Sequence, residues 1–213
     1  CVMPHICCRD KNAIAMRSQL LGAHINNINN FLVITGDPIP SMVRSSVKSV
    51  FNFDSVGLMN IISDMNQDQF ADKPVIYGGA INQGRVNFKV ELARVKKKME
   101  AGATFFMTQP VFSDEDISRL RQIKEETGAR ILCGIMPFVS LRNATFMKNE
   151  MTGINVTDEI LARYSADMTK EEGEETGIQI AKEIITKTSD FVDGYYFSFP
   201  FNRVHMLEKI LNA

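Results

Sequence analysis

Short runs of apolar residues alternate with segments of helical periodicity along this chain of 213 residues. The apolar runs, rich in β-branched and aromatic residues, predict strands at residues 2–8, 31–37, 73–80, 103–109, 130–136 and 192–199. Between them, apolar residues recur at helical spacing, which predicts helices at residues 12–27, 53–65, 87–102, 114–128, 140–151, 157–167, 170–189 and 202–213. Gly102 and Gly128 stand where two of these helices are expected to stop. The pattern therefore predicts six strand–helix units.

The predicted strands are continuous apolar runs, without regular alternation of polar and apolar positions. Such strands are typical of a parallel sheet covered by helices. A doubly wound sheet would satisfy this pattern. So would the larger part of a (β/α)8 barrel that lacks two N-terminal units, roughly 70 residues at the usual unit length. No linker or low-complexity segment divides the chain, so residues 1–213 are expected to form a single α/β domain.

Composition and charge restrict the classes of function. Hydrophobic residues make up 45% of the chain and charged residues 23%, which fits a globular domain with a sizeable core. The 24 basic and 25 acidic residues form no basic arm, so no nucleic-acid partner is expected. No apolar run approaches the ~20 residues of a membrane span and no signal peptide is visible, so we expect the cytoplasm and no membrane partner. The chain opens abruptly in a strand at Cys1, from which we expect further residues upstream.

The cysteines give little sign of a disulfide framework or a metal centre. Cys1, Cys7, Cys8 and Cys133 lack the number and spacing of a small disulfide-linked fold. His5 with Cys7 could begin a metal site, but no second cluster of His and Cys residues completes it. No metal is therefore expected.

Polar side chains stand at the carboxyl ends of the predicted strands, where active sites gather in parallel α/β folds. They include His5, Arg9, Thr35, Asp37, Asn82, Gln109, Asn143, Ser198 and Arg203. Gln109 raises a specific question, because a buried carboxamide without hydrogen-bond partners costs roughly 1–3 kcal/mol. Either the protein or a ligand must satisfy it.

The residue types at these strand ends allow a limited chemistry. The sequence has no Ser/His pair at a nucleophile elbow, no P-loop and no dense carboxylate cluster. One carboxylate, several amides, aromatic rings and cations remain, a set that suits a conjugated ring cofactor and a polar heterocycle. Arg94, Lys97 and Lys98 share one helix face at i, i+3 and i+4 and could hold a pyrophosphate. A solvated helix face explains the same spacing.

Several segments together resemble the methylenetetrahydrofolate reductases. They are HICCRD, ITGDP, EAGATFFMTQPVF, GIMPFVSLRN and FSFPFNR, in that family's order and spread over nearly all of the chain. The resemblance implies a (β/α)8 TIM barrel, of which this chain covers about six strand–helix units, with FAD at the strand ends. It implies reduction of 5,10-methylenetetrahydrofolate to 5-methyltetrahydrofolate, with NADH or NADPH reducing the flavin. The segment PFVSLRNATFMKNE is most similar to bacterial members, some of which carry a fused homocysteine methyltransferase domain; a homo-oligomer is left open.

The resemblance also implies roles for individual residues. The implied cofactor contacts are His5, Thr35, Gly36, Asp37, Phe51, Asn82, Arg94, Lys97 and Lys98, and the implied substrate contacts are Gln109, Leu141, Phe199 and Arg203. Asp37 is the implied catalytic residue, because a fixed carboxylate stabilises a cationic iminium form of the substrate. Gln109 would pair with the donor–acceptor edge of the pterin ring. The family's catalytic glutamate lies on an earlier strand, so no residue here takes that role and this segment alone could be inactive.

Some positions depart from the family pattern, and simpler explanations stay open. Thr35 stands where some relatives have Arg, Asn82 where some have His, and Leu141 where some have Phe. Gln109 could bond to backbone, and Asp37 could serve a turn before Pro38. Packing in the core would explain Phe199 or His5, and a surface ion pair would explain Arg203. Two other classes of protein also fit: a TIM-barrel enzyme without flavin, and a truncated, non-catalytic barrel segment that acts as an interaction module.

Overall fold

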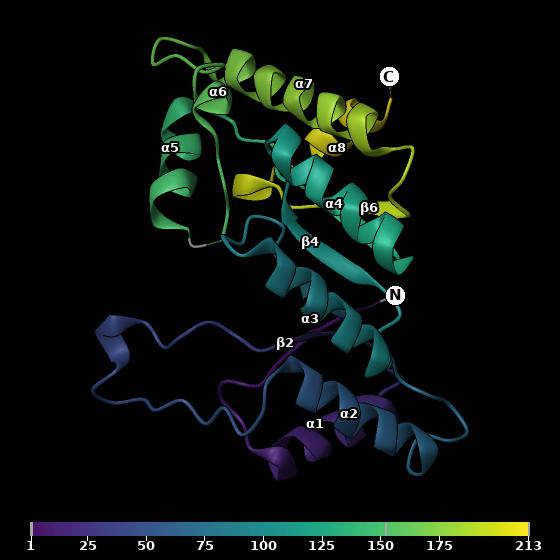
Figure 1. Cartoon of the computed structure of the whole chain (residues 1–213). Helices are drawn as coiled ribbons and strands as arrows, with labels where there is room; N and C mark the ends of the chain where they lie inside the picture. Colours follow the sequence, from purple (N-terminus) through teal and green to yellow (C-terminus); the bar gives the residue numbers. More distant parts are fainter. Residues whose placement is uncertain (1, 152, 213) are drawn as a thin grey trace. The chain divides into compact units, whose positions relative to one another are not determined.

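The computed structural model describes residues 2–151 and 153–212. Within these ranges the strands are β1 (His5–Cys7), β2 (Asn30–Ile34), β3 (Ile76–Ile81), β4 (Phe106–Pro110), β5 (Ile131–Ile135) and β6 (Gly194–Phe197) (Figure 1). The α-helices are α1 (Ala13–Ile25), α2 (Ser55–Gln67), α3 (Phe88–Glu100), α4 (Asp114–Thr127), α5 (Leu141–Glu150), α6 (Asp158–Leu161), α7 (Lys170–Thr188) and α8 (His205–Leu211). Each predicted strand and helix is present, although the helix predicted at residues 157–167 is limited to the single turn of α6. The short 3-10 helices η1 (Ser41–Val43) and η2 (Pro200–Asn202) were not predicted.

The strands of the described residues belong to one open, parallel sheet in the order β1-β2-β3-β4-β5-β6. In the register, His5 pairs with Leu32, Leu32 with Gly78, and Cys133 with Tyr195. A doubly wound sheet reverses its strand order at a switch point, whereas this order follows the chain throughout. The prediction of six strand–helix units of a TIM-barrel fold is therefore confirmed for the described residues, whose sheet does not close.

The chain folds into two compact units. The first extends to Ala80 and includes Ala93–Phe106, and the second contains Ile81–Leu92 and the chain from Met107 onward. That residues 1–213 form a single domain stays a prediction. No helix among the described residues is both long and apolar enough to cross a membrane.

The core of the first unit lies between strands and helices. Ile6 is 1% exposed, whereas its neighbour His5 is exposed, so β1 buries one face only. The helices contribute apolar side chains at spacings of three and four residues, namely Met16 and Leu20 from α1 and Leu58, Ile62 and Met65 from α2. Because this core holds the strands, the loops at their carboxyl ends start from defined positions.

The core of the second unit is built in the same way. Ile131, Cys133 and Ile135 are buried on one face of β5. The helices of this unit add Ile117, Leu120 and Ile123 from α4 and Ile178, Ala181 and Ile184 from α7. Alternate residues of a strand point to opposite faces, so Leu132 and Gly134 remain for the other face.

Two glycines on α7 let this helix approach the segment that follows β5. A Cβ on Gly177 would lie 2.0 Å from the backbone oxygen of Phe138, and one on Gly173 would lie 2.3 Å from that of Val139. Real Cβ atoms do not come so close, so α7 packs directly on backbone here. The contact fixes the segment that leads into Leu141 at the start of α5.

The helix ends follow the signals expected from the sequence. Gly102 and Gly128, the predicted stops, have φ angles of +92° and +67°, which glycine adopts without strain. At the start of α4, the hydroxyl of Ser113 accepts a hydrogen bond from the backbone N–H of Asp116 at 3.0 Å. A glycine stop and a serine cap each depend on only a few neighbouring residues, so both can be recognised in the sequence.

Asp116 itself is an unusual buried carboxyl group in the first turn of α4. It is 1% exposed, and its Oδ2 has no hydrogen-bond partner among the described residues. Burial is the main cause that raises the pKa of this carboxyl, against the hydrogen bonds from Ser113 and the backbone of Phe112. Because the folded state holds the proton more tightly than the unfolded chain, the stability that this group contributes is lost as the pH rises through the folded pKa.

We therefore expect the free energy of unfolding of Asp116→Asn, measured relative to that of the unchanged protein, to be higher at neutral pH than at acidic pH. An unpaired buried polar group costs about 1–3 kcal/mol, which bounds the effect. Urea unfolding at a series of pH values from about 4, the ordinary Asp pKa, to about 8 measures it. Two stability curves that run parallel over this range would show that Asp116 does not titrate as described.

Candidate functional site

In the first unit, the loop after β2 brings Thr35, Gly36 and Asp37 beside the end of β1. Gly36 has a φ of +94°, and a Cβ there would lie 2.1 Å from the Sγ of Cys7, so only glycine fits. The hydroxyl of Thr35 accepts a hydrogen bond from the backbone N–H of Ser55 at 3.0 Å, where α2 begins. Asp37 is exposed, and its carboxylate makes no hydrogen bond or ion pair with another described residue. This carboxylate is open to a ligand.

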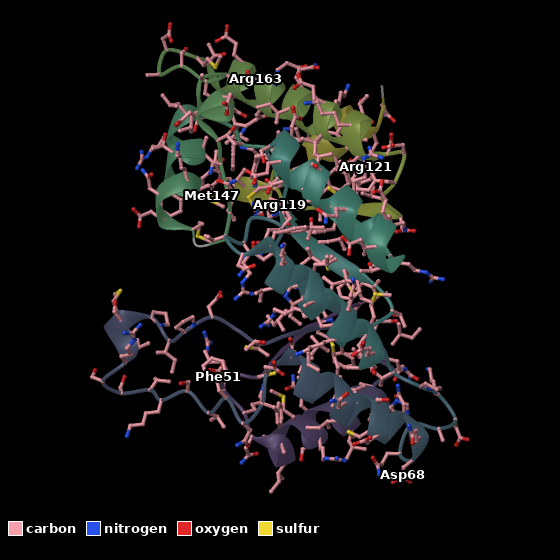
Figure 2. All side chains as sticks on the ribbon, in the orientation of Figure 1. Phe51, Asp68, Arg119, Arg121, Met147 and Arg163 are labelled. Atoms are coloured by element: carbon pink, nitrogen blue, oxygen red, sulfur yellow. The ribbon has the colours of Figure 1, made fainter. Side chains whose placement is uncertain are left out.

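Arg9, just beyond β1, ties the two ends of the following loop together. Its Nη1 donates to the backbone carbonyl of Asp37 at 3.3 Å. Its own carbonyl accepts from the backbone N–H of Val50 at 2.7 Å and from that of Phe51 at 3.4 Å. Phe51 has a φ of +39°, a strained value for an aromatic residue, and is 38% exposed on the loop before α2 (Figure 2). Asp37 and Phe51 are thus both anchored at Arg9.

His5 projects from the face of β1 that the core leaves open. Its neighbour Ile6 is buried, and His5 is exposed, so His5 is not a core residue. Cys7 lies on the same face, and its thiol donates to the backbone carbonyl of Thr35 at 3.5 Å. The open face of β1 therefore leads from His5 through Cys7 to the loop that contains Gly36.

The three cations of α3 differ in their surroundings. Lys97 is exposed, Arg94 is half-buried and Lys98 is only 4% exposed. The amine of Lys98 donates to the backbone carbonyl of Ala80 near the end of β3. The three cations were predicted to share one helix face. In the structure Lys98 reaches the carboxyl end of β3, whereas Lys97 is exposed to solvent.

In the second unit, two carboxamide side chains lie near the carboxyl ends of β3 and β4. A Cβ on Gly153 would lie 3.8 Å from the Nδ2 of Asn82 and 4.0 Å from the Cδ of Gln109, so both carboxamides lie near this glycine. The Oδ1 of Asn82 is buried and has no hydrogen-bond partner within the described ranges. The half-buried carboxamide of Gln109 likewise makes no hydrogen bond to another described residue. Two amides with unused hydrogen-bonding capacity therefore stand together.

Phe199 lines a small cavity where β5 and β6 end. The cavity has a volume of about 120 Å³ and is lined by Met136, Phe138, Asn143, Met147, Ser198, Phe199 and Pro200. The ring of Phe199 is parallel to that of Phe197, with 5.8 Å between the centroids. An apolar cavity with one hydroxyl and one carboxamide suits an aromatic group better than a charged one.

Leu141 and Arg203 lie elsewhere in the second unit. Leu141 lines a different cavity, of about 420 Å³, with Ser140, Arg142, Thr145, Ser165, Ala166, Met168 and Thr169. The guanidinium of Arg203 is paired with the carboxylate of Glu174 on α7, which also contacts the Nε2 of His205 at 2.9 Å. The structure therefore does not place either residue in the cavity that contains Phe199.

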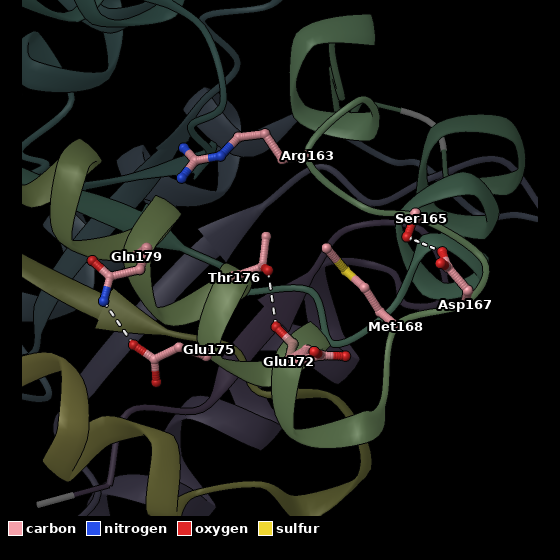
Figure 3. A pocket seen from close by; sticks show the side chains of 8 residues that line it. All are labelled: Arg163, Ser165, Asp167, Met168, Glu172, Glu175, Thr176 and Gln179. Carbon is pink, nitrogen blue, oxygen red and sulfur yellow. Dashed lines mark hydrogen bonds between the residues drawn. The ribbon is translucent and has the colours of Figure 1, made fainter.

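A larger groove of about 700 Å³ runs beside α7, and no predicted site residue lines it (Figure 3). Its polar side chains bond to one another or to nearby backbone. The amide of Gln179 donates to Glu175 at 2.7 Å, and the hydroxyl of Thr176 donates to the carbonyl of Glu172 at 2.8 Å. The groove is therefore large but offers few unpaired groups to a ligand.

With this geometry established, comparison with known proteins identifies the family. A model of the family described as methylenetetrahydrofolate reductase matches residues 1–212. The chain belongs to this family. Among its relatives, the 5,10-methylenetetrahydrofolate reductase of Salmonella typhimurium is 24% identical over 214 residues, which cover 99% of this chain and 69% of that protein. The family resemblance read from the sequence motifs is confirmed.

A solved structure supports the fold of this methylenetetrahydrofolate reductase family member. It is an uncharacterized protein from Clostridium thermocellum that binds two copies of 5-methyl-5,6,7,8-tetrahydrofolic acid. The match covers 99% of this chain and 92% of that one, with a TM-score of 0.52 and 13% identity. At this identity the likeness concerns the fold.

Sequence reasoning identified most of these strand-end residues from their positions, but it missed others that organise them. Arg9 was recognised only as a strand-end cation, and Glu174 and Gly153 were not singled out at all. Arg9 and Glu174 act through contacts with residues distant in sequence. A helix-face pattern could have marked Glu174 as polar, but no local signal names its partner.

Proposed function

We propose that this chain reduces 5,10-methylenetetrahydrofolate to 5-methyltetrahydrofolate, with FAD as the cofactor and NADH or NADPH as the source of electrons. Membership of the methylenetetrahydrofolate reductase family supports the reaction. The observation that carries it is the carboxamide of Gln109, which is half-buried at a strand end without a partner among the described residues. A structural neighbour that binds 5-methyltetrahydrofolic acid is consistent with a folate ligand.

Gln109 is proposed to bind the pterin ring. A carboxamide offers both a donor and an acceptor, which complements the mixed edge of a pterin. The alternative was a strand-end amide bonded to backbone, and the side chain of Gln109 makes no such bond in the described ranges. Leaving a half-buried amide unpaired is unfavourable, so a ligand that satisfies it gains affinity.

The residues of the first unit fit the cofactor. The carboxylate of Asp37 and the ring of Phe51 are exposed, the backbone of Phe51 is strained, and Gly36 adds no side chain beside Cys7. We propose that His5, Thr35, Gly36 and Phe51 contact the flavin and that Arg94, Lys97 and Lys98 hold its phosphates and ribose. Asn82, which belongs to the second unit, is likewise proposed as a flavin contact. FAD, when bound, supplies the electron pair for the reduction. Asp37 then stabilises positive charge on the substrate with its carboxylate.

The rest of the substrate is assigned to the second unit. Phe199 lines an apolar cavity and is proposed to stack on an aromatic part of the folate. Leu141 is proposed to contact the substrate from the start of α5. Arg203 is proposed to bind the glutamyl carboxylates of the folate. In this structure its guanidinium is paired with the carboxylate of Glu174, which the folate carboxylates would replace. A cytoplasmic location, a homo-oligomer and a fused methyltransferase domain stay predictions of the sequence.

An absorption spectrum and two kinetic measurements test this proposal. The purified protein should show flavin absorbance after incubation with FAD and gel filtration. NADH or NADPH should bleach it, and 5,10-methylenetetrahydrofolate should restore it. A protein that stays colourless with FAD but binds 5-methyltetrahydrofolate would be a folate-binding barrel without flavin. A protein that binds neither would fit the non-catalytic interaction module.

A further inference from the structure

Gln83 is a fully buried glutamine just beyond β3, in the same unit as Gln109. It is 1% exposed, and its carboxamide bonds to the backbone around Gln109 on both sides. The Oε1 of Gln83 accepts from the backbone N–H of Gln109 at 3.1 Å. Its Nε2 donates to the carbonyl of Gln109 at 3.0 Å and to that of Pro110 at 3.3 Å.

These bonds take the place of backbone hydrogen bonds from β3, which ends before β4 does. β3 ends at Ile81, whereas β4 continues to Pro110. The hydroxyl of Thr108 also donates to the carbonyl of Gln109, at 2.7 Å, but the backbone N–H of Gln109 is bonded only to Gln83 among the described residues. Buried backbone groups are rarely left unpaired. One side-chain amide presents a donor and an acceptor in the geometry of a peptide group, so Gln83 extends the hydrogen-bond pattern past the end of β3.

Gln83 is itself held in place from α4. The Nη1 of Arg119 donates to the backbone carbonyl of Gln83 at 2.8 Å and to that of Arg85 at 3.2 Å. The guanidinium lies over the ring of Phe88, 5.4 Å from its centroid, and pairs with the carboxylate of Glu115. Arg119, Gln83 and the backbone of Gln109 therefore form a continuous chain of polar contacts.

We propose that Gln83 is a positioning residue that sets the direction of the Gln109 carboxamide toward the pterin. This inference rests on the proposed function. The direction of a side chain follows from the backbone that bears it, and recognition groups lose effect when they are misplaced by about an ångström. Gln83 makes no contact with the ligand and acts only through Gln109. Its loss should therefore weaken folate recognition and leave flavin reduction unchanged.

The test is a double-mutant cycle on the FAD-loaded protein. Gln83→Leu should raise the KM for 5,10-methylenetetrahydrofolate about 10-fold with little change in kcat, since a lost binding contact acts on KM. The Kd for 5-methyltetrahydrofolate should rise by a similar factor. Gln109→Ala should have an effect at least as large. In the double variant, the KM should equal that of Gln109→Ala alone, because the direction of an absent carboxamide cannot matter.

Asn66 offers a matched control in the first unit. Its carboxamide also bonds to both backbone groups of one residue, accepting from the N–H of Val75, just before β3, at 2.8 Å and donating to its carbonyl at 2.9 Å. Asn66→Leu should lower the thermal stability, as Gln83→Leu should, but it should leave the KM for 5,10-methylenetetrahydrofolate unchanged. If Gln83→Leu does not fold, Arg119→Met loosens the same chain of contacts and should raise the KM about 3-fold, again only when Gln109 is present.

The outcomes separate the two proposals. Effects of Gln83 and Gln109 that multiply in the double variant, or an unchanged KM in Gln83→Leu, would overturn the positioning role while leaving the reductase intact. An equal rise in KM for Asn66→Leu would show that general destabilisation is responsible. An unmodified protein that neither retains FAD nor reduces the folate would overturn the proposed function, and the positioning role with it.

Discussion

Replacing Gly177 with alanine should lower the free energy of unfolding by about 3 kcal/mol, the largest stability effect that we expect from a single methyl group in this protein. The added Cβ would lie 2.0 Å from the backbone oxygen of Phe138. That oxygen belongs to the main chain and also accepts a hydrogen bond from the hydroxyl of Tyr164 at 3.2 Å. The clash therefore cannot be relieved by rotating a side chain, and moving the backbone would strain a buried hydrogen bond.

Gly22 provides the control for this prediction. It also lies inside a helix, α1, but a Cβ there would meet nothing within 4 Å. Gly22→Ala should therefore raise the free energy of unfolding by about 0.5–1 kcal/mol, through helix propensity alone. Urea unfolding of both variants measures the difference. Equal stabilisation by the two alanines would show that α7 does not pack on the backbone of Phe138.

Replacing Asp37 with asparagine should slow reduction of the folate about 100-fold, while reduction of bound flavin by NADH or NADPH changes less than about 3-fold. The substitution keeps the size of the side chain and removes its charge. The carboxylate is exposed and makes no ion pair with another described residue, so little folding energy depends on it. Its proposed task is to stabilise positive charge that develops on the substrate, which arises in only one of the two half-reactions.

Stopped-flow absorbance at the flavin band measures the two half-reactions separately. Asp54→Asn is the matched control, because Asp54 ends the same loop and caps α2 by accepting from the N–H of Gly57 at 3.0 Å. Asparagine caps helices about as well as aspartate, so both half-reactions should keep their rates. Equal losses in the two half-reactions of Asp37→Asn would assign Asp37 to cofactor binding and exclude the charge-stabilising role.

The predicted strands and helices agree with the structure because the signals behind them are local. Apolar runs and helical periodicity reflect which faces of an element are buried, and glycines such as Gly128 mark ends through their own backbone angles. The continuous apolar strands also indicated a parallel sheet covered by helices. They did not distinguish a barrel from a doubly wound sheet, since both bury parallel strands; the observed strand order does.

The sequence could nominate residues for the candidate site, which stay a prediction, but it could not give their arrangement. Position at a strand end singled out Asp37, Asn82 and Gln109, because parallel strands bring their carboxyl ends to one edge. Spacing on α3 placed Lys97 and Lys98 on one face, yet one is exposed and the other bonds to the carbonyl of Ala80. Periodicity describes a face, but it does not say how far each side chain reaches into the fold.

The amino-acid pattern was sufficient for the α/β class, the six strand–helix units and the family, because each depends on short segments of the chain and on the motifs within them. The pattern could not show which glutamine side chain bonds to the backbone and which keeps its carboxamide unpaired among the described residues. Gln83 and Gln109 are the same residue type near the ends of neighbouring strands, 26 positions apart, and the carboxamide of one is fully paired whereas that of the other is not. That difference arises from where one strand stops and the next continues, and hydrogen bonds between distant segments exist only once the chain has folded.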